Sequence, residues 1–227
     1  MFIRKNVKAV NSFDSKPQPV QLKGYPPCMV ECFQLLRAAD VQHFSLFGGA
    51  VRDADYSARH NQCRPIKDYD IRVWLPTADY AQHLEAFIKM LANVSNVTIE
   101  EVPSLGTNRI RHCLTYKGVE LDISVRPTPE EFKNHLVPVE AVAIDRSSDS
   151  DVGLCSVAID SLGRAWAKPE YILDQIMKTL TVYPNTNSER KIAYAKRMKE
   201  KFPDHVIAWT DKLDKSLLSV SRLCIGS

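Results

Sequence analysis

Two stretches of this 227-residue chain decide its fold: LFGGAVRD at residues 46–53 and KDYDIR at residues 67–72. The first stretch ends an apolar run with two glycines and continues into residues that favour a helix. This order predicts a strand, a tight turn and a helix start. Glycines at such a turn let backbone N–H groups approach a phosphate, and a helix N-terminus adds partial positive charge. Gly48 and Gly49 are therefore candidate nucleotide-binding residues.

The second stretch predicts a strand with two carboxylates on one face. Residues i and i+2 of a strand point to the same side, so Asp68 and Asp70 project together while Tyr69 points the other way. Two neighbouring carboxylates repel each other unless a cation lies between them. Carboxylate oxygens suit Mg²⁺, especially where a nucleotide phosphate completes the coordination shell. We therefore expect Asp68 and Asp70 to bind Mg²⁺.

Together, and in this order, the two stretches resemble the head domain of class II tRNA nucleotidyltransferases (CCA-adding enzymes) and bacterial poly(A) polymerases. That family carries G-G-x-V-R-D, a short loop, and then a K-D-x-D strand. The matching residues are Gly48, Gly49, Val51, Arg52, Asp53, Lys67, Asp68 and Asp70. The resemblance implies an α+β fold, with a DNA polymerase beta-like nucleotidyltransferase head and a mixed sheet, followed by a small helical C-terminal region. It also implies nucleotide-binding roles for Arg52, Asp53 and Lys67.

A third carboxylate is expected on a later strand. Residues 119–126 alternate, with apolar side chains at 119, 121, 123 and 125 and polar ones between them. In the resembled family a third catalytic carboxylate lies on a strand beside the D-x-D strand. Asp122 is the candidate for this metal-binding and catalytic position, and Glu120 is its substitute.

Residues 153–163 look similar to the family segment D-F-T-I-N-A-M-A, which is followed by an acidic residue and a glycine. Asp151 stands near the first acidic residue of that segment, so the resemblance implies a nucleotide-binding role for it. The paired arginines that precede this segment in the family, and help to bind the triphosphate, are absent here. Their charge could come from Arg109, Arg111 or Arg126, which could equally be solvated strand residues.

The helix predicted over Glu189 to Lys201 matches the family's neck helix, whose start carries an E-D-x-x-R motif that reads the incoming base. Residues 187–191 read NSERK, so the acidic pair is missing and no base preference carries over. This is the most basic stretch of the chain. It could contact RNA or phosphate, or simply form a solvated helix face. One more amphipathic helix is predicted over residues 205–223.

Three regions are expected along the chain: an N-terminal arm over 1–27, a nucleotidyltransferase head over 28–165 and a helical neck-like region over 166–227. Within the head, a hairpin is predicted through Lys117-Gly118. The net charge of +3 permits nucleic-acid binding without arguing for it. No apolar run suggests a secretory signal or a membrane span, and the six cysteines form no C-x-x-C pair. We therefore expect a cytoplasmic protein with reduced thiols and no membrane partner; the oligomeric state stays open.

The resemblance implies Mg²⁺-dependent transfer of a nucleoside monophosphate from an NTP, ATP or CTP, to an acceptor hydroxyl. In this scheme Asp68 and Asp70 bridge two Mg²⁺ ions, and Asp122 binds the ion nearer the attacking hydroxyl. For Arg52 we favour a positioning role, paired with a carboxylate such as Asp53 or Asp70, over a phosphate contact.

An RNA 3′ end is the favoured acceptor. Two alternatives remain open: the same transfer to a protein side chain or a small molecule, and an inactive nucleotide-binding regulatory module. The chain contains no P-loop, no G-x-S-x-G and no H-E-x-x-H motif.

Overall fold

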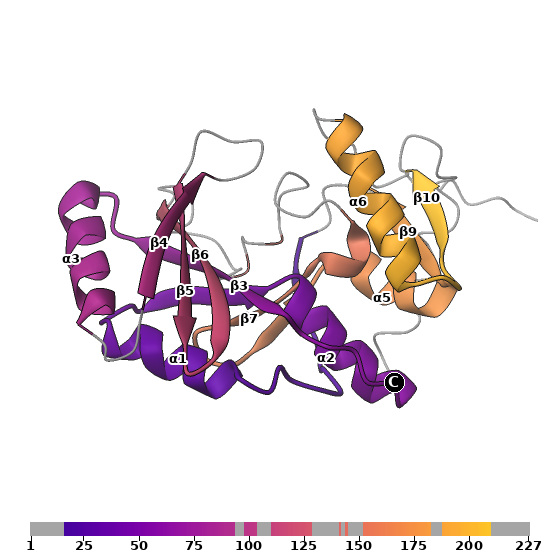
Figure 1. Cartoon of the computed structure of the whole chain (residues 1–227). Helices are drawn as coiled ribbons and strands as arrows, with labels where there is room; N and C mark the ends of the chain where they lie inside the picture. The colour runs from indigo at the N-terminus through magenta and orange to yellow at the C-terminus, as the bar shows by residue number, and fades with distance from the viewer. Residues whose placement is uncertain are drawn as a thin grey trace, which may run out of the picture.

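The apolar run that precedes the two glycines forms β2 (His43–Phe47), in the middle of a mixed sheet. The computed structural model describes residues 16–93, 98–103, 110–128, 141, 144, 152–182 and 188–209. In this described part the main sheet has eight strands in the order β1-β8-β7-β2-β3-β6-β5-β4. Figure 1 shows α6, β9 and β10 at one end of the molecule and α3, β4 and β5 at the other. The α+β class with a mixed sheet, expected from the sequence, is confirmed.

The described elements follow the chain in a simple order. The helices are α1 (Met29–Ala38), α2 (Gly49–His60), α3 (Tyr80–Ala92), the 3₁₀ turn η4 (Gly153–Cys155), α5 (Pro169–Met177) and α6 (Ser188–Lys201). The other strands are β1 (Gln18–Pro19), β3 (Asp68–Leu75), β4 (Thr98–Pro103), β5 (Ile110–Tyr116), β6 (Val119–Pro127), β7 (Val157–Asp160), β8 (Ala165–Ala167), β9 (Thr179–Val182) and β10 (Val206–Trp209).

The central strand β3 pairs with β2 in antiparallel fashion and with β6 in parallel fashion. β5 and β6 form the predicted hairpin, and its turn residues Lys117 and Gly118 both have positive φ angles, of 51° and 79°. Two successive positive φ angles are what a two-residue hairpin loop requires to match the twist of its strands. This hairpin places β6 beside β3 in the sheet.

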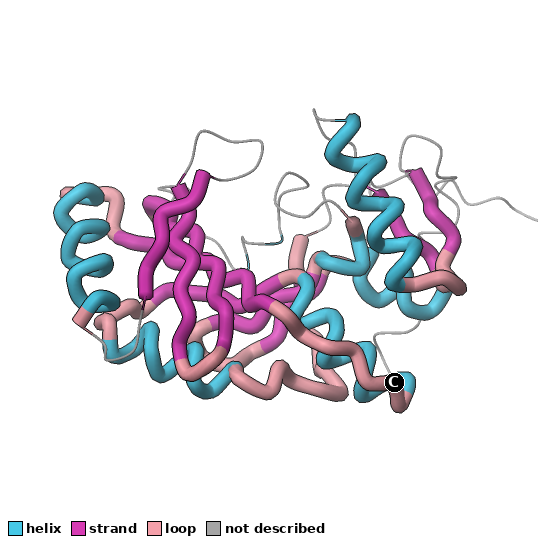
Figure 2. The backbone as a smooth tube through the Cα atoms, viewed as in Figure 1, coloured by secondary structure: helices cyan, strands magenta, loops and turns pink. Residues whose placement is uncertain are grey.

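The apolar faces of β3 and β6 pack against helices, and Figure 2 shows α1 and α2 along the lower side of the sheet. Strand alternation sends every second side chain into this core. The core members from the two strands are Tyr69, Ile71, Val73, Leu75, Leu121, Ile123 and Val125. The opposite faces of the same strands are consequently free to carry polar groups.

The N-terminal segment lies against the head. β1 extends the sheet by antiparallel pairing with β8, and the backbone N–H of Lys23 donates to Asp55 on α2 at 2.6 Å. At Gly24 a Cβ atom would come within 2.6 Å of the carbonyl oxygen of Ala54. Only a glycine allows the arm to approach α2 so closely.

The C-terminal part contains a β-α-β unit in which β9 and β10 pair in parallel and α6 connects them. The predicted helix over 205–223 is wrong at its start, because residues 206–209 form β10 instead. Their apolar, β-rich sequence VIAW pairs with β9, and this pairing outweighs the helical periodicity. Residues 210–227 lie outside the described part. No helix within the described ranges is long and apolar enough to cross a membrane.

Candidate active site

The parallel pairing of β3 with β6 brings the predicted carboxylates together. Asp70 lies directly opposite Asp122, and Asp68 lies directly opposite Glu120. Directly paired residues of neighbouring strands share a face, as do residues two apart on one strand. The four carboxylates therefore occupy one face of two adjacent strands, on the side away from the helix-covered core. Both Asp122 and its substitute Glu120 meet this condition.

These carboxylates differ in exposure. Asp68 and Glu120 are exposed, whereas Asp70 and Asp122 are half-buried. Within the described ranges, no group of three or more His, Cys, Asp or Glu side chains has an arrangement that could hold a metal ion as it stands. The backbone register is thus set for a shared site, while the side chains have not converged on one point.

The glycine turn lies next to this carboxylate face. Gly48 connects β2 to α2 with a φ angle of 71°, and a Cβ atom there would lie 3.5 Å from Oδ2 of Asp70. Its own N–H donates to the carbonyl of Val157 at 3.0 Å. The N–H groups of the first residues of α2, beginning at Gly49, have no acceptor within the helix. The predicted strand, turn and helix start are confirmed.

Arg52 is buried and its guanidinium is bonded to protein groups. Nε and Nη2 donate to the two carboxylate oxygens of Asp53, each at 2.9 Å. Nη1 donates to Sγ of Cys155 at 2.9 Å and to Sδ of Met198 at 3.3 Å. Lys201 at the end of α6 also pairs with Asp53. This network ties the start of α2 to η4 and α6.

Tyr194 links α6 to η4, a contact that the sequence alone did not indicate. Its hydroxyl lies 3.3 Å from Sγ of Cys155. Cys155 and burial raise the pKa of Tyr194 well above its usual value, and Asp70 adds to this increase. The guanidinium of Arg197 lies over the Tyr194 ring at 5.2 Å. The charge of Asp70 therefore acts weakly on Tyr194 of α6.

Arg72 is a second residue that sequence reasoning missed. It follows Asp70 by two positions and therefore shares its face, a relation that the period-2 pattern of the strand could have revealed. The guanidinium lies over the ring of Phe47 at 5.0 Å, and Nε donates to Ser124 at 3.3 Å. Arg126 lies on the same face of β6 as Asp122. Arg109, the side chain of Arg111 and Asp151 lie outside what the structure describes.

Two of the basic residues of α6 serve the fold. Nζ of Lys199 donates to the carbonyls of Pro203 and His205 at 2.7 and 2.6 Å, closing the turn after the helix. Lys201 pairs with Asp53. Lys196 and Arg197 are exposed.

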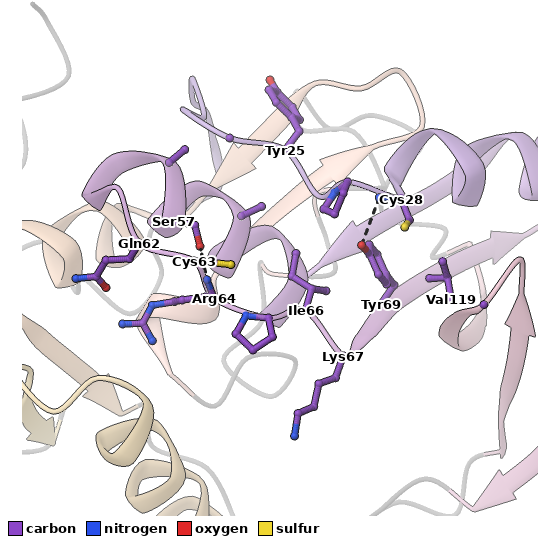
Figure 3. Close-up of a pocket in the computed structure, with 16 residues that line it drawn as sticks. Tyr25, Cys28, Ser57, Gln62, Cys63, Arg64, Ile66, Lys67, Tyr69 and Val119 are labelled. Atoms are coloured by element: carbon purple, nitrogen blue, oxygen red, sulfur yellow. Dashed lines mark hydrogen bonds between the residues drawn. The ribbon is translucent and has the colours of Figure 1, made fainter.

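Lys67 immediately precedes β3 and its first carboxylate, Asp68. Together with Tyr69 it lines a pocket of about 720 Å³, and Figure 3 shows the Lys67 side chain extending away from Tyr69. The walls are formed by residues 24–28 of the N-terminal segment, the second half of α2, the loop over 62–67 and the turn before β6.

Comparison with known proteins relates the fold to solved structures only. No family model and no curated protein matches the chain. A complex of a CCA-adding enzyme with CTP is 19% identical over 87% of this chain, with a TM-score of 0.50, and 43% of that enzyme is covered. This likeness confirms the nucleotidyltransferase-like fold, and the chain spans less than half the length of that enzyme.

Two further solved structures are similar. A tRNA nucleotidyltransferase complexed with a primer tRNA and an incoming ATP analog is 16% identical, with a TM-score of 0.49, and the match covers 84% of this chain and 49% of that one. A tRNA-processing enzyme complex is 14% identical, with a TM-score of 0.47, and the match covers 84% of this chain and 46% of the matched chain.

Proposed function

We propose that this chain is a Mg²⁺-dependent nucleotidyltransferase that moves a nucleoside monophosphate from ATP or CTP to the hydroxyl at an RNA 3′ end. The observation that carries the proposal is the β3–β6 register, which sets Asp70 opposite Asp122 and places Asp68 beside them. In this reaction a bond forms between the acceptor oxygen and the α-phosphorus. The bond from the α-phosphorus to the oxygen bridging to the β-phosphorus breaks, and pyrophosphate leaves.

The donor set fits Mg²⁺ in kind, because carboxylate oxygens are the hard ligands that this ion prefers. Asp68, Asp70 and Asp122 would hold two ions, and changes in side-chain torsion can bring their oxygens together because the backbone register is already set. When bound, the ions lower the pKa of the attacking hydroxyl and offset charge on the triphosphate.

The chain's own groups would position the triphosphate beside the carboxylates. Gly48 leaves room next to Asp70, and the N-terminus of α2 presents N–H groups and partial positive charge to a phosphate. Arg126, on the face of Asp122, is the described arginine that could take the place of the family's missing pair. Arg52 would act indirectly, by fixing α2 against α6 through Asp53 and Cys155.

The test uses purified protein, Mg²⁺ and each α-labelled NTP in turn, offered with total RNA. Label is followed into RNA, into protein and into small molecules. The active-site variant is Asp70→Asn, which removes one charge with little change of shape. Asp79→Asn is the matched control, because Asp79 is exposed at the start of α3 and has a positive φ angle that Asn tolerates.

We expect Mg²⁺-dependent label in RNA from the wild type and from Asp79→Asn, and none from Asp70→Asn. Label in protein or in a small molecule would show that the acceptor is not RNA, in line with the second alternative. No transfer to any acceptor, with each NTP supplied, would overturn the proposed activity.

A further inference from the structure

The pocket beside Lys67 has walls of mixed character. Its apolar part comes from prolines, alanines and aliphatic side chains, and Tyr25 is 47% exposed at its edge. Figure 3 shows Tyr25 on one side of the pocket and Arg64 and Lys67 on the other. The hydroxyl of Tyr69 accepts a hydrogen bond from the backbone N–H of Cys28 at 3.3 Å, so the floor is fixed to the N-terminal segment.

The charge of the pocket favours an anionic ligand. Arg64 and Lys67 line it, and none of the described lining residues is Asp or Glu. Arg64 is held in place, because its Nη1 donates to the carbonyl of Lys201 at 2.6 Å and its guanidinium lies 4.1 Å from the centre of the Phe202 ring. Lys67 is exposed and can follow a ligand. A negatively charged group is therefore matched directly by Lys67, whereas the guanidinium of Arg64, which is already bonded to the carbonyl of Lys201, only adds positive charge to the surroundings of the pocket.

The uncharged part of the pocket favours a flat, apolar group. An exposed tyrosine ring offers a stacking surface, and every nucleobase has a π-face that can use it. A row of cations beside aromatic rings is how proteins bind single-stranded nucleic acid without reading its sequence. A volume of about 720 Å³ lies within the usual range for binding a ligand of nucleotide size.

The pocket and the carboxylate face meet at the ends of the same two strands. Lys67 and Tyr69 alternate along the chain with Asp68 and Asp70, and Gly118 and Val119 of the pocket directly precede Glu120. Successive strand residues are about 3.3 Å apart. A single-stranded RNA whose 3′ end lies at the carboxylates can therefore pass around the ends of β3 and β6 and reach the pocket within a few nucleotides.

We propose that this pocket binds a nucleotide of the acceptor strand a few positions upstream of the RNA 3′ end. Its base stacks on Tyr25, and a neighbouring phosphate lies near Lys67. The inference rests on the proposed function, because it assigns the acceptor of that reaction to RNA and gives the strand a path. It also gives Lys67 a role toward the acceptor instead of the incoming NTP.

The test measures binding of a 5′-fluorescein-labelled, mixed-sequence 12-nucleotide RNA by anisotropy, in EDTA so that no metal is needed. Tyr25→Ala should weaken binding roughly tenfold, and Tyr25→Phe, which keeps the ring, should restore it. Lys67→Gln should lower the slope of log K against log salt by about 0.7, the value of one phosphate contact in a single strand. Lys89→Gln, an exposed lysine on α3 paired with Glu85, is the matched control and should leave the slope unchanged.

Equal affinities for wild type and Tyr25→Ala would overturn the inference. So would competition by AMP at the same affinity as the RNA, which would make the pocket a mononucleotide site. The labelling experiment with Asp70→Asn is run on the same RNA. If transfer is lost in Asp70→Asn but RNA affinity is unchanged in Tyr25→Ala, the proposed role of the pocket is overturned and the proposed activity stands. RNA binding that needs Tyr25, combined with no transfer by the wild type, overturns the proposed activity and leaves the pocket standing.

Discussion

The buried carboxyl of Asp174 should make the stability of the fold decrease as the pH rises toward 7. This carboxyl on α5 is fully buried, and burial raises its pKa from 3.8 to about 7. Its oxygens accept hydrogen bonds from the hydroxyls of Thr179 and Thr181 at 2.7 and 2.6 Å and from the N–H of Thr181 at 2.9 Å. These bonds close the turn between α5 and β9. They lower the pKa of Asp174, but by less than burial raises it.

The sign follows from proton binding. A carboxyl with a raised pKa binds more protons in the folded state than in the unfolded state between pH 3.8 and about 7. Its contribution is therefore fully present below pH 4 and is lost as the pH rises toward 7. At about 1.4 kcal/mol per pH unit, the difference amounts to about 4 kcal/mol of unfolding free energy. For a chain of this size that is roughly 8–16 °C in Tm.

Buried histidines complicate the wild-type profile. Burial lowers the pKa of His112 and His205, and a lowered histidine pKa makes stability rise with pH in the window just below 6.5. The assay therefore compares Tm for wild type and Asp174→Asn at each pH from 4 to 8, with Asp79→Asn as the exposed control. The wild type should lose stability relative to Asp174→Asn as the pH rises. Parallel profiles over the whole range would refute the reasoning.

Three further changes have expected outcomes. Gly48→Ala forces a side chain into a positive φ angle and towards Asp70, so it should cost about 1–3 kcal/mol in urea unfolding and lower kcat for transfer; unchanged values of both would contradict the glycine argument. Arg52→Met leaves the buried carboxylate of Asp53 with one cation fewer and should lower the free energy of unfolding in urea by about 3 kcal/mol. A urea midpoint equal to that of the wild type would show that the network does not stabilise the fold. Phe202→Ala empties a fully buried ring position and should cost about 3–5 kcal/mol by the same measurement; a loss below about 1 kcal/mol would mean that α6 is not packed on α2 as described.

The parts of the site that were predictable from sequence are those set by local periodicity. Asp68 and Asp70 share a face because a strand has a period of two, and Gly48 is a glycine because the turn needs a positive φ angle. The same alternation marked Asp122 on β6. Its place opposite Asp70, however, depends on a parallel pairing between strands about fifty residues apart, and only the resemblance to a family suggested it.

The parts that were not predictable depend on contacts between distant elements. Tyr194 on α6 reaches Cys155 on η4, a contact between distant elements that no local pattern encodes. The start of the helix expected over 205–223 is wrong for a related reason: a short apolar run forms a helix or a strand according to its partner, and β9 supplies that partner for residues 206–209. Propensity and period indicate what a segment can form, whereas tertiary pairing decides between the options.

Positive charge is the property for which counting residues in the sequence is least informative. The stretch over 188–201 has the highest density of cations in the chain, yet Lys199 bonds to carbonyls after the helix and Lys201 pairs with Asp53. A cation that is held by protein groups must break those bonds before it can serve a phosphate, so its attraction for RNA is discounted. Within the described residues, no carboxylate forms an ion pair with the exposed Lys196 and Arg197 on α6 or with Lys67 at the pocket. The path of an acceptor strand should therefore be sought along these exposed cations, and the basic composition of α6 as a whole is a poor guide to it.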